Sequence, residues 1–441
     1  MDTLFSNISV ITMDERMQVL TDAFVGITDG KISWLAKKPP EEKPETIIDG
    51  TGMVLMPGLI NCHTRLSETL LRGYADDLSA EDRLGKLYPR LEQMDEKSAK
   101  ASALLGIAQC LRMGVTSVSD LGLFADAVAQ AAAESGIRAN VAQELTLLQE
   151  DDFDFEKDPG CQKLTAVAEA WHGYDDGRIL VEAGLQGTYT SCYPLWEALT
   201  EYTVNSHLGI HLNLSRFPWE NEDCLDRSGL TPAQLLDCHN VFAARTQAAH
   251  CCHLEQEDMA LLGRKKATAV VCSVTDRKLT AGDADIAAMV KSGMNVALGT
   301  GSAAEGGTMD LLQQARSAAL CAKMKAGDPE LLNAASVLLM ATVCGAKAQG
   351  RGDVCGMVKP GLDADLIALD FTQPHLIPSH DLMGSVAYTA TGMDVCMTMV
   401  RGKILYASGK YTTIDLSQLM TELAEHAMPT VFTQKEEPTD E

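Results

Sequence analysis

The 441-residue sequence lacks the features of a secreted or membrane-spanning protein. It has no run of about 18 apolar residues, and no basic stretch followed by an apolar one occurs at its start. Its 13 cysteines show no Cys-x-x-Cys spacing, and an odd number of them in a long chain argues against a disulfide framework. We therefore expect a cytoplasmic protein that neither spans a membrane nor is exported.

Basic residues are also scarce, with 36 Lys and Arg against 61 Asp and Glu, which gives a formal net charge of −25. A charge of this sign repels phosphates and anionic lipids at long range, so we expect neither nucleic acid nor a membrane surface as a partner. The composition is otherwise that of an ordinary globular protein. Disorder is therefore expected at the ends, above all in the acidic residues 432–441.

Two sequence textures divide the chain. Residues 1–57 and 353–415 contain short strand patterns separated by turns. Because each part alone has too few strands to bury a sheet face, we expect both chain ends to pair in one small β-sandwich domain. Residues 58–352 alternate apolar strand-like runs with helical stretches, and residues 416–441 predict a C-terminal helix and an acidic tail.

Eight strand-plus-helix units can be counted between residues 58 and 352, which favours a closed (β/α)8 barrel of the TIM type. An open doubly wound sheet is the main competitor, but no Gly-x-Gly-x-x-Gly loop follows a strand. The predicted fold class is therefore α/β, with a barrel and a smaller β domain. The predicted barrel strands are residues 59–63, 116–120, 139–145, 179–185, 209–214, 247–251, 269–274 and 295–299.

Four stretches carry a resemblance to a known family: residues 56–64 (MPGLINCHT), 69–78 (TLLRGYADDL), 297–300 (ALGT) and 361–366 (GLDADL). In them the chain resembles the amidohydrolase superfamily. Within it, the chain is most similar to the aminohydrolases that deaminate 5′-methylthioadenosine and S-adenosylhomocysteine, with guanine deaminases and triazine hydrolases as neighbours. The resemblance covers almost the whole chain and implies a metal-activated water at the C-terminal ends of the barrel strands.

The resemblance also implies where the chemical groups should lie. The family's metal ligands are a His-x-His pair after strand one, a His after strand five and an Asp after strand eight. A Glu three residues beyond the strand-five His moves protons, and a His after strand six bonds the water.

Several of these positions differ in this sequence. The first pair reads His63-Thr64-Arg65, and a guanidinium neither loses its proton nor binds a cation. Strand five keeps His211 but has Leu214 at the position of the proton-moving carboxylate. Strand six keeps His250 at the water-contacting position.

The last strands differ as well. Strand seven has Val271 where the family commonly has His, and Cys272 follows it. Strand eight has Gly301 in the place of the metal-binding Asp. Strand four has Gln186 where the family often has a substrate-contacting His. Because only His63 and His211 remain as direct ligands, we expect no bound cofactor and a vestigial role for His250. The alternative is one divalent metal, zinc or iron, at reduced occupancy.

Plainer interpretations stay open for the same residues. The three histidines could be satisfied by hydrogen bonds in a former site. Arg65 could hold an anionic group in place of the metal's charge, or it could pair with Glu68 or a backbone carbonyl. A soft-metal site is conceivable at four cysteines near strand ends, although free cysteines are usually small buried hydrophobes; these are Cys62, Cys251, Cys252 and Cys272. Arg72, Asp76 and Asp77 could contact a ligand or brace their loop.

Three functions follow as hypotheses. The first is a catalytically impaired protein that binds a small heterocycle, with its pocket at the former active site formed by Arg65, Gln186, Leu214, Val271, Cys272 and Gly301. The second is an active hydrolase of C–N bonds, a cyclic amidine or purine-type deaminase, that uses His250 with Cys272 or a tyrosine in a rewired site. The third is a companion subunit of an active paralogue, and a homodimer is the expected assembly.

Overall fold

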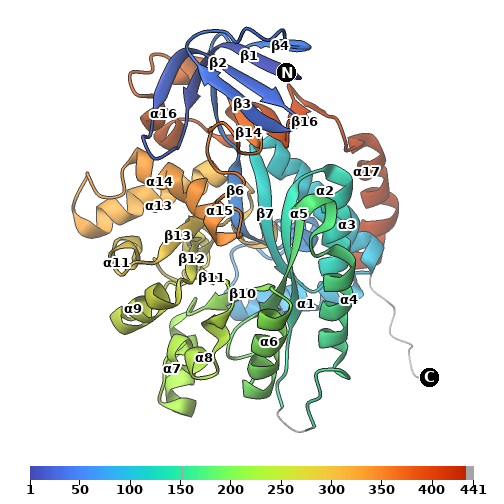
Figure 1. The fold of residues 1–441 in the computed structure, drawn as a ribbon. Coiled ribbons are helices and arrows are strands. Elements are labelled where there is room, and N and C mark those ends of the chain that lie inside the picture. The colour runs from blue at the N-terminus through green and yellow to red at the C-terminus, as the bar shows by residue number, and fades with distance from the viewer. Residues whose placement is uncertain (150–151, 434–441) are drawn as a thin grey trace.

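The eight predicted barrel strands are all present, and each is hydrogen-bonded in parallel to the next along the chain (Figure 1). The computed structural model describes residues 1–149 and 152–433. Nearly every residue of these strands is buried, which agrees with their continuous apolar runs. The strands are β6 (Leu59–Thr64), β7 (Val115–Gly122), β8 (Arg138–Leu145), β9 (Ile179–Leu185), β10 (Gly209–Leu214), β11 (Thr246–His250), β12 (Thr268–Val271) and β13 (Asn295–Leu298).

The barrel closes where its first and last strands meet. Thr64, the last residue of β6, forms a parallel bridge with Gly301, which lies just beyond the end of β13. The backbone N–H groups of Thr300 and Gly301 both donate to the carbonyl of His63, at 3.1 and 3.0 Å. The carboxyl ends of strands one and eight are therefore adjacent, as the predicted (β/α)8 barrel requires.

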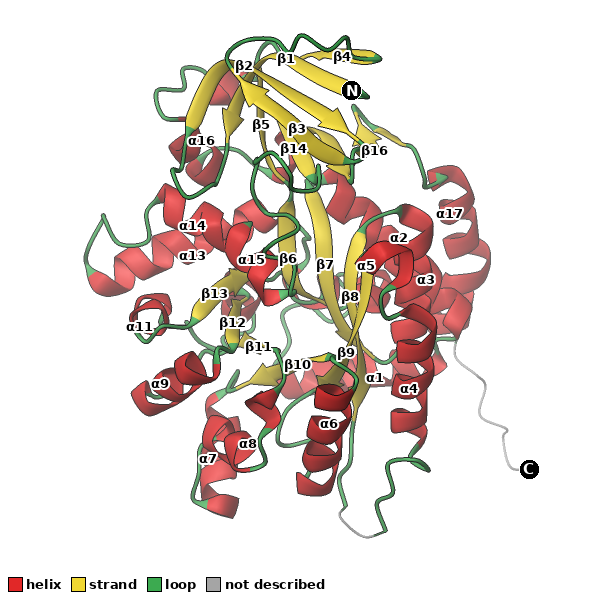
Figure 2. Ribbon diagram, in the orientation of Figure 1, coloured by secondary structure: helices red, strands yellow, loops and turns green. Residues whose placement is uncertain are grey.

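Helices surround the barrel and also follow several strands at its carboxyl end (Figure 2). Side-chain caps start many of them; the carboxylate of Asp95, for example, accepts from the N–H of Ser98 at the start of α2. The outer helices are α2 (Glu96–Arg112), α3 (Ala125–Ser135), α4 (Pro159–Trp171), α6 (Tyr193–Asn205), α7 (Pro218–Ser228), α8 (Pro232–Cys238), α9 (Gln256–Lys265), α11 (Ile286–Lys291), α13 (Leu311–Ala326), α14 (Ala334–Met340) and α15 (Val343–Ala348). Shorter or inserted helices are α1 (Ala80–Gln93), α5 (Tyr174–Gly177), α10 (Ser273–Lys278), α12 (Ala303–Gly306) and α16 (Leu382–Tyr388).

The two chain ends pair in one β unit, as expected from their short strands. The central contact is the antiparallel pair of β5 and β14, which joins the N-terminal strands to the C-terminal ones. The nine strands are hydrogen-bonded in one continuous sheet, because β5 has a partner on each side. The strands are β1 (Thr3–Ile11), β2 (Val19–Thr28), β3 (Lys31–Ala36), β4 (Thr46–Asp49), β5 (Met53–Pro57), β14 (Leu366–Asp370), β15 (Val395–Val400), β16 (Lys403–Ala407) and β17 (Lys410–Tyr411).

This sheet lies at the amino end of the barrel strands, away from the end where barrel chemistry is expected (Figure 1). Arg138, the first residue of β8, forms ion pairs with Asp363 at 2.6 Å and Asp365 at 2.5 Å. The backbone N–H of Gly58 donates to the carbonyl of Asp365 at 2.9 Å. The composite sheet therefore braces the barrel without bordering its mouth.

The predicted C-terminal helix is present as α17 (Leu416–Glu422), a π-helical turn (Leu423–Ala427) and α18 (Met428–Phe432). Phe432 lies edge-on to Tyr74, with ring centroids 5.2 Å apart, and the guanidinium of Arg90 packs over both rings. The end of the chain thus holds α1 in place. Of the predicted acidic tail, residues 434–441 lie outside the described part of the chain. Along the described residues, no helix combines the length and apolar character needed to cross a membrane.

Candidate functional site

Three histidines predicted from the sequence come together at the carboxyl end of the barrel. His63, His211 and His250 are each at most 1% exposed. Nδ1 of His63 lies 2.9 Å from Nε2 of His211, so one ring nitrogen donates to the other. The rings of His63 and His250 meet edge-to-face with centroids 5.0 Å apart. The barrel therefore brings these three side chains together, as the sequence predicts.

His250 has a carboxylate partner that the sequence did not reveal. Its Nδ1 lies 2.7 Å from Oδ1 of Asp276, a residue of α10 directly after strand seven. His250 and Cys251 adopt positive φ angles of 74° and 55°, a strained backbone that such residues adopt where the surrounding structure requires it. Burial and the nearby charge of Arg216 lower the pKa of His250, which favours the neutral imidazole. Among the described residues, its buried Nε2 has no hydrogen-bond partner.

Arg65 forms the first of two ion-pair groups near the histidines. Its Nη1 donates to Oε2 of Glu144 at 2.8 Å and reaches Oε1 of Glu68 at 3.5 Å, while its Nη2 donates to Oε1 of Gln186. Burial alone lowers the pKa of Arg65, but the carboxylates of Glu144 and Glu68 raise it above its ordinary value. The pairing with Glu68 was one expectation from the sequence; the closer partner, Glu144, was missed.

Arg216 forms the second group, and none of its members was predicted. Its Nη1 and Nη2 both donate to Glu305 at 3.2 Å, and its Nε donates to Asp276 at 3.3 Å. Arg83, on α1, donates to the same Glu305 at 2.5 Å. Burial raises the pKa of Glu305, but the two guanidiniums outweigh this and hold its pKa below the ordinary value. The pairs join residues far apart in the sequence, so no local pattern indicates them.

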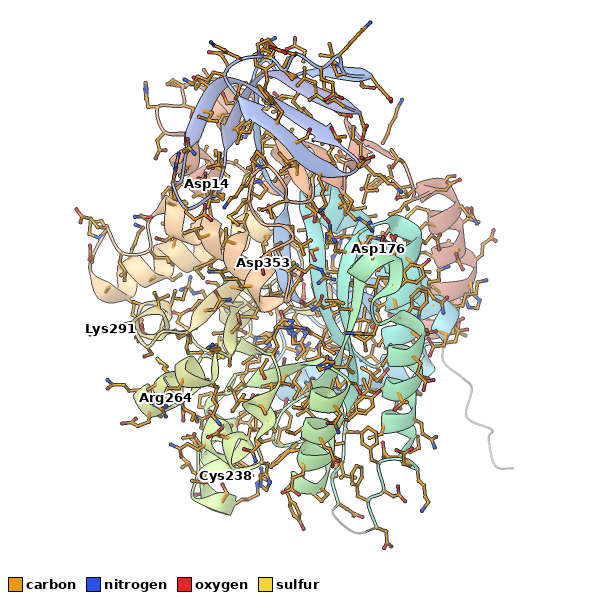
Figure 3. The ribbon with its side chains drawn as sticks, in the orientation of Figure 1. Asp14, Asp176, Cys238, Arg264, Lys291 and Asp353 are labelled. Atoms are coloured by element: carbon orange, nitrogen blue, oxygen red, sulfur yellow. The ribbon has the colours of Figure 1, made fainter. Side chains whose placement is uncertain are left out.

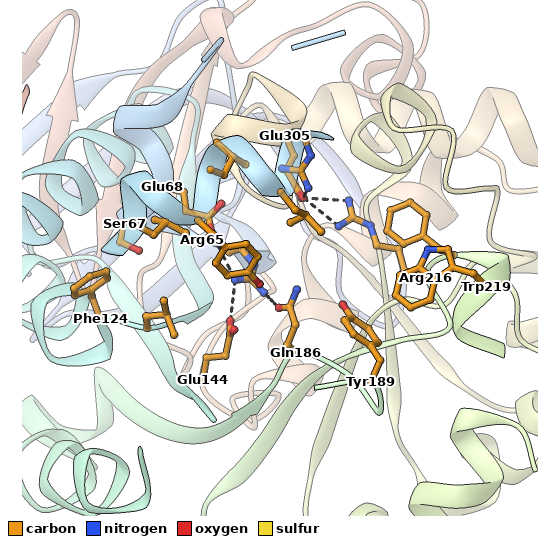
Figure 4. Close-up of a pocket in the computed structure, with 17 residues that line it drawn as sticks. Arg65, Ser67, Glu68, Phe124, Glu144, Gln186, Tyr189, Arg216, Trp219 and Glu305 are labelled. Atoms are coloured by element: carbon orange, nitrogen blue, oxygen red, sulfur yellow. Dashed lines mark hydrogen bonds and ion pairs between the residues drawn. The ribbon is translucent and has the colours of Figure 1, made fainter. Parts of the chain in front are cut away.

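A cavity of about 380 Å³ opens at this end of the barrel, within the size range of small-molecule sites (Figure 4). One wall is aromatic: Tyr189 lies edge-on to Trp219 at 4.9 Å, and Phe217 stacks on Trp219 at 6.0 Å with the ring planes 12° apart. The charged part of the lining consists of Arg65, Glu68, Arg83, Glu144, Arg216 and Glu305, with Gln186 beside them.

Only two of the six predicted pocket residues line this cavity. Arg65 and Gln186 do, whereas four others are buried and are not part of the lining: Leu214, Val271, Cys272 and Gly301. The three histidines are not part of it either. Arg65 and Arg216 reach the cavity instead, and Arg216 is linked to His250 through Asp276. The cavity lining is thus connected to His250 through Arg216 and Asp276.

Few donor groups at the barrel mouth are arranged for a divalent metal. In the part of the chain that the structure describes, no group of three or more His, Cys, Asp or Glu side chains is arranged to hold one. His63 and His211 use their facing nitrogens on each other, and Arg65 brings a permanent positive charge to the position after them. Gly301, to which the sequence resemblance assigns the place of the carboxylate ligand, has no side chain.

The sequence left two interpretations open for the cysteines near strand ends and for the loop after strand one. Burial raises the pKa of the thiols of Cys62, Cys251, Cys252 and Cys272, which favours their protonated form in the metal-free chain. Cys238, at the end of α8, is exposed on the outside of the barrel (Figure 3). In the loop, Arg72 donates to Gln109 and Asp76 pairs with Lys278 at 2.7 Å.

The closed barrel with histidines at its strand ends defines the class of protein, and comparison with known proteins gives the family. The model of the amidohydrolase family matches residues 54–405. The chain is 34% identical over 412 residues to a 5-methylthioadenosine/S-adenosylhomocysteine deaminase of Moorella thermoacetica, covering 92% of this chain and 94% of that protein. It is 32% identical over 422 residues to a 5′-deoxyadenosine deaminase of Methanosarcina acetivorans, covering 96% of each.

Solved structures of other proteins share the fold of this chain. An adenosine deaminase from Xanthomonas campestris with bound zinc superposes with a TM-score of 0.90 at 26% identity, over 96% of this chain and 97% of that one. A zinc complex of an atrazine chlorohydrolase from Arthrobacter aurescens TC1 shares the fold, with a TM-score of 0.87 at 23% identity over 96% and 99% of the chains. The chain belongs to the amidohydrolase family, as the sequence resemblance predicts.

Proposed function

We propose that this chain binds a planar nitrogen heterocycle in the cavity beside Arg65 and performs little or no metal-dependent deamination. The observation that carries the proposal is the ion pair of Arg65 with Glu144 at 2.8 Å. A fixed guanidinium takes the place of a neutral metal ligand, and it is tied to a carboxylate that also lines the cavity. The charge and the donor set both disfavour a divalent cation there.

The cavity supports a flat aromatic ligand. The wall of Tyr189, Phe217 and Trp219 offers ring faces for stacking. The cavity volume of about 380 Å³ suits a small heterocycle. The relatives named for 5-methylthioadenosine and 5′-deoxyadenosine suggest adenosine-type compounds as the first ligands to test.

The second candidate is an active hydrolase of C–N bonds. The names of the relatives favour it over a protein that has lost its catalytic activity. Several relatives more than 30% identical over almost their full length are named as deaminases, and solved neighbours hold zinc. In this chain the group available for such chemistry is His250. Its Nδ1 is held by Asp276, and its unpartnered Nε2 could accept a proton from a water, which is the arrangement of an oriented general base.

Metal content and ammonia release separate the two candidates. The purified full-length chain is analysed for zinc, iron and manganese by mass spectrometry, then incubated with 5′-methylthioadenosine and with adenosine. We expect far less than one metal per chain, no steady ammonia release, and a ligand-dependent rise in melting temperature. Stoichiometric metal together with steady ammonia release would overturn the first candidate and establish the second.

The assembly and compartment are proposals from the sequence. We infer a cytoplasmic homodimer, or a companion of an active paralogue. Light scattering of the purified chain tests the first, and co-purification of a related chain from the native cell tests the second. A monomer that captures no related chain contradicts both.

A further inference from the structure

Arg65 fixes two cavity residues at once. Its Nη1 donates to Oε2 of Glu144 and its Nη2 donates to Oε1 of Gln186, so the two partners occupy neighbouring nitrogens of one planar group. A guanidinium has only donors, so the atom of Gln186 that faces it must be the amide oxygen. Nδ2 of Asn213 donates to the same oxygen at 3.3 Å, which fixes the amide a second time.

Two atoms of these side chains are left over, one acceptor and one donor. Oε1 of Glu144 and Nε2 of Gln186 have no hydrogen bond among the described residues, although the side chain of Glu144 is only 3% exposed. Both residues line the cavity and lie side by side next to Arg65 in Figure 4. Polar atoms that line a cavity and have no partner in the protein are the places where a ligand gains its hydrogen bonds.

The charges around this pair argue against an anionic ligand. Arg65 is already shared by Glu144 and Glu68, and Arg83 and Arg216 converge on Glu305. Each of these three guanidiniums therefore already has a carboxylate partner. The sequence-based alternative, in which Arg65 holds an anionic group, therefore has no charge to support it. A neutral ligand or one that donates hydrogen bonds suits the cavity better.

We infer that Glu144 and Gln186 recognise one edge of the bound heterocycle through hydrogen bonds, an inference that rests on the proposed binding function. The free carboxylate oxygen accepts from an exocyclic amino group, and the amide N–H donates to the ring nitrogen next to it. The ligand class is an aromatic heterocycle with an amino group beside a ring nitrogen, an amidine-like edge. Arg65 is the positioning residue, because its hydrogen bonds hold both side chains in place.

Three nucleosides that differ only at this edge test the inference. Adenosine carries the amino group, purine riboside lacks it, and inosine presents a carbonyl oxygen that a carboxylate repels. We expect calorimetry on the full chain to rank adenosine tightest, purine riboside about tenfold or more weaker, and inosine weakest, because hydrogen bonds to charged groups are strong. Ammonia is measured in parallel, so that turnover is not mistaken for binding.

A pair of variants assigns the effect to Glu144. In Glu144→Gln we expect adenosine and purine riboside to bind within about twofold of each other, because the charged acceptor is gone. Glu201→Gln makes the same change at an exposed residue of α6 and is expected to keep the wild-type ranking. If Glu144→Gln does not fold, the ranking on the wild-type chain still decides the matter.

The outcomes separate this inference from the proposed function. Two outcomes would overturn the recognition of the amino group by Glu144 but leave a heterocycle-binding protein. They are equal binding of the three nucleosides by the wild-type chain and an unchanged preference in Glu144→Gln. Tight binding of inosine alone also overturns it. If none of the three nucleosides binds, both the inference and the proposed adenosine-type ligand fall together.

Discussion

At the scale of single residues, Arg65 is a buried cation on which the surrounding carboxylates depend. Its side chain is 12% exposed and that of Glu144 is 3% exposed. Removing one partner of a buried pair leaves the other charge without compensation in a poorly solvated place, and this costs far more than the pair itself contributes. The same reasoning gives exposed pairs little weight.

We therefore expect Arg65→Ala to lower the free energy of unfolding by about 3–5 kcal/mol. Lys359→Ala is the matched control, because it breaks an ion pair with Glu15 of the same length, 2.8 Å, in which both side chains are exposed; its expected cost is below about 1 kcal/mol. Urea-induced unfolding measures both. Similar costs for the two variants would show that Arg65 does not hold buried charge in the way its contacts indicate.

The backbone conformation and close neighbours of Gly301 make it costly to rebuild a metal site there. Its φ angle is +66°, and a Cβ there would lie 3.2 Å from Cγ2 of Thr275 and 3.6 Å from Oε2 of Glu305. A left-handed backbone is tolerated by Asp better than by most residues but is still strained. A carboxylate at this position would also approach the one of Glu305.

Restoring the family's residues together, as Arg65→His, Leu214→Glu, Val271→His and Gly301→Asp, is expected to recover binding of a divalent metal, because the donors return to inherited positions. The strain at position 301 should lower stability by roughly 1–3 kcal/mol relative to the triple variant that keeps Gly301. Metal analysis and calorimetry measure the two effects. A folded quadruple variant that takes up no metal would contradict the assignment of these positions.

At the scale of elements, α7 begins on a buried carboxylate that responds to pH. Glu220 accepts from the backbone N–H groups of Arg216 and Phe217, both at 3.2 Å, and closes the first turn of the helix. Burial raises the pKa of Glu220 to about 7, although the two backbone N–H groups and Arg216 act to lower it. A carboxyl with a raised pKa binds its proton more tightly in the folded chain than in the unfolded chain.

The stabilisation from Glu220 is therefore fully present below its unfolded pKa, near 4.5, and is lost as the pH rises through about 7. We expect Glu220→Gln, which keeps an acceptor for the helix start, to remove on the order of 2 kcal/mol of this pH dependence. Unfolding midpoints at pH 5 and pH 8 test it. A variant whose midpoints fall between these pH values as steeply as in the wild type refutes the assignment.

The elements themselves were predictable because their signals are local. Apolar runs such as residues 209–214 mark a buried strand wherever they occur, and all eight barrel strands were placed within a few residues. The convergence of His63, His211 and His250 followed from the family pattern on those strands. The ion pairs were not predictable, because Arg65 meets Glu144 and Arg216 meets Glu305 only after the barrel has closed.

At the scale of the whole molecule, the barrel and the composite sheet share more than a boundary. β5 ends at Pro57 and β6 begins at Leu59, so one strand leads almost directly into the other. The main apolar core includes sheet residues such as Met56, Ile367 and Val395 together with barrel residues such as Ile107. The sequence suggested two compact units, 58–352 and the paired chain ends, yet the buried apolar surface runs across the boundary between them.

We therefore expect residues 58–352 expressed alone to be insoluble or to lack a cooperative unfolding transition, because the excision exposes apolar side chains at the amino end of the barrel and removes the partners of Arg138. The full chain should melt in one transition, since neither unit can open without uncovering the shared core. Solubility and circular dichroism of both chains, purified in parallel, provide the measurement. A soluble excised barrel that melts cooperatively near the temperature of the full chain would show that the barrel is an independent domain and that the composite sheet contributes little to its stability.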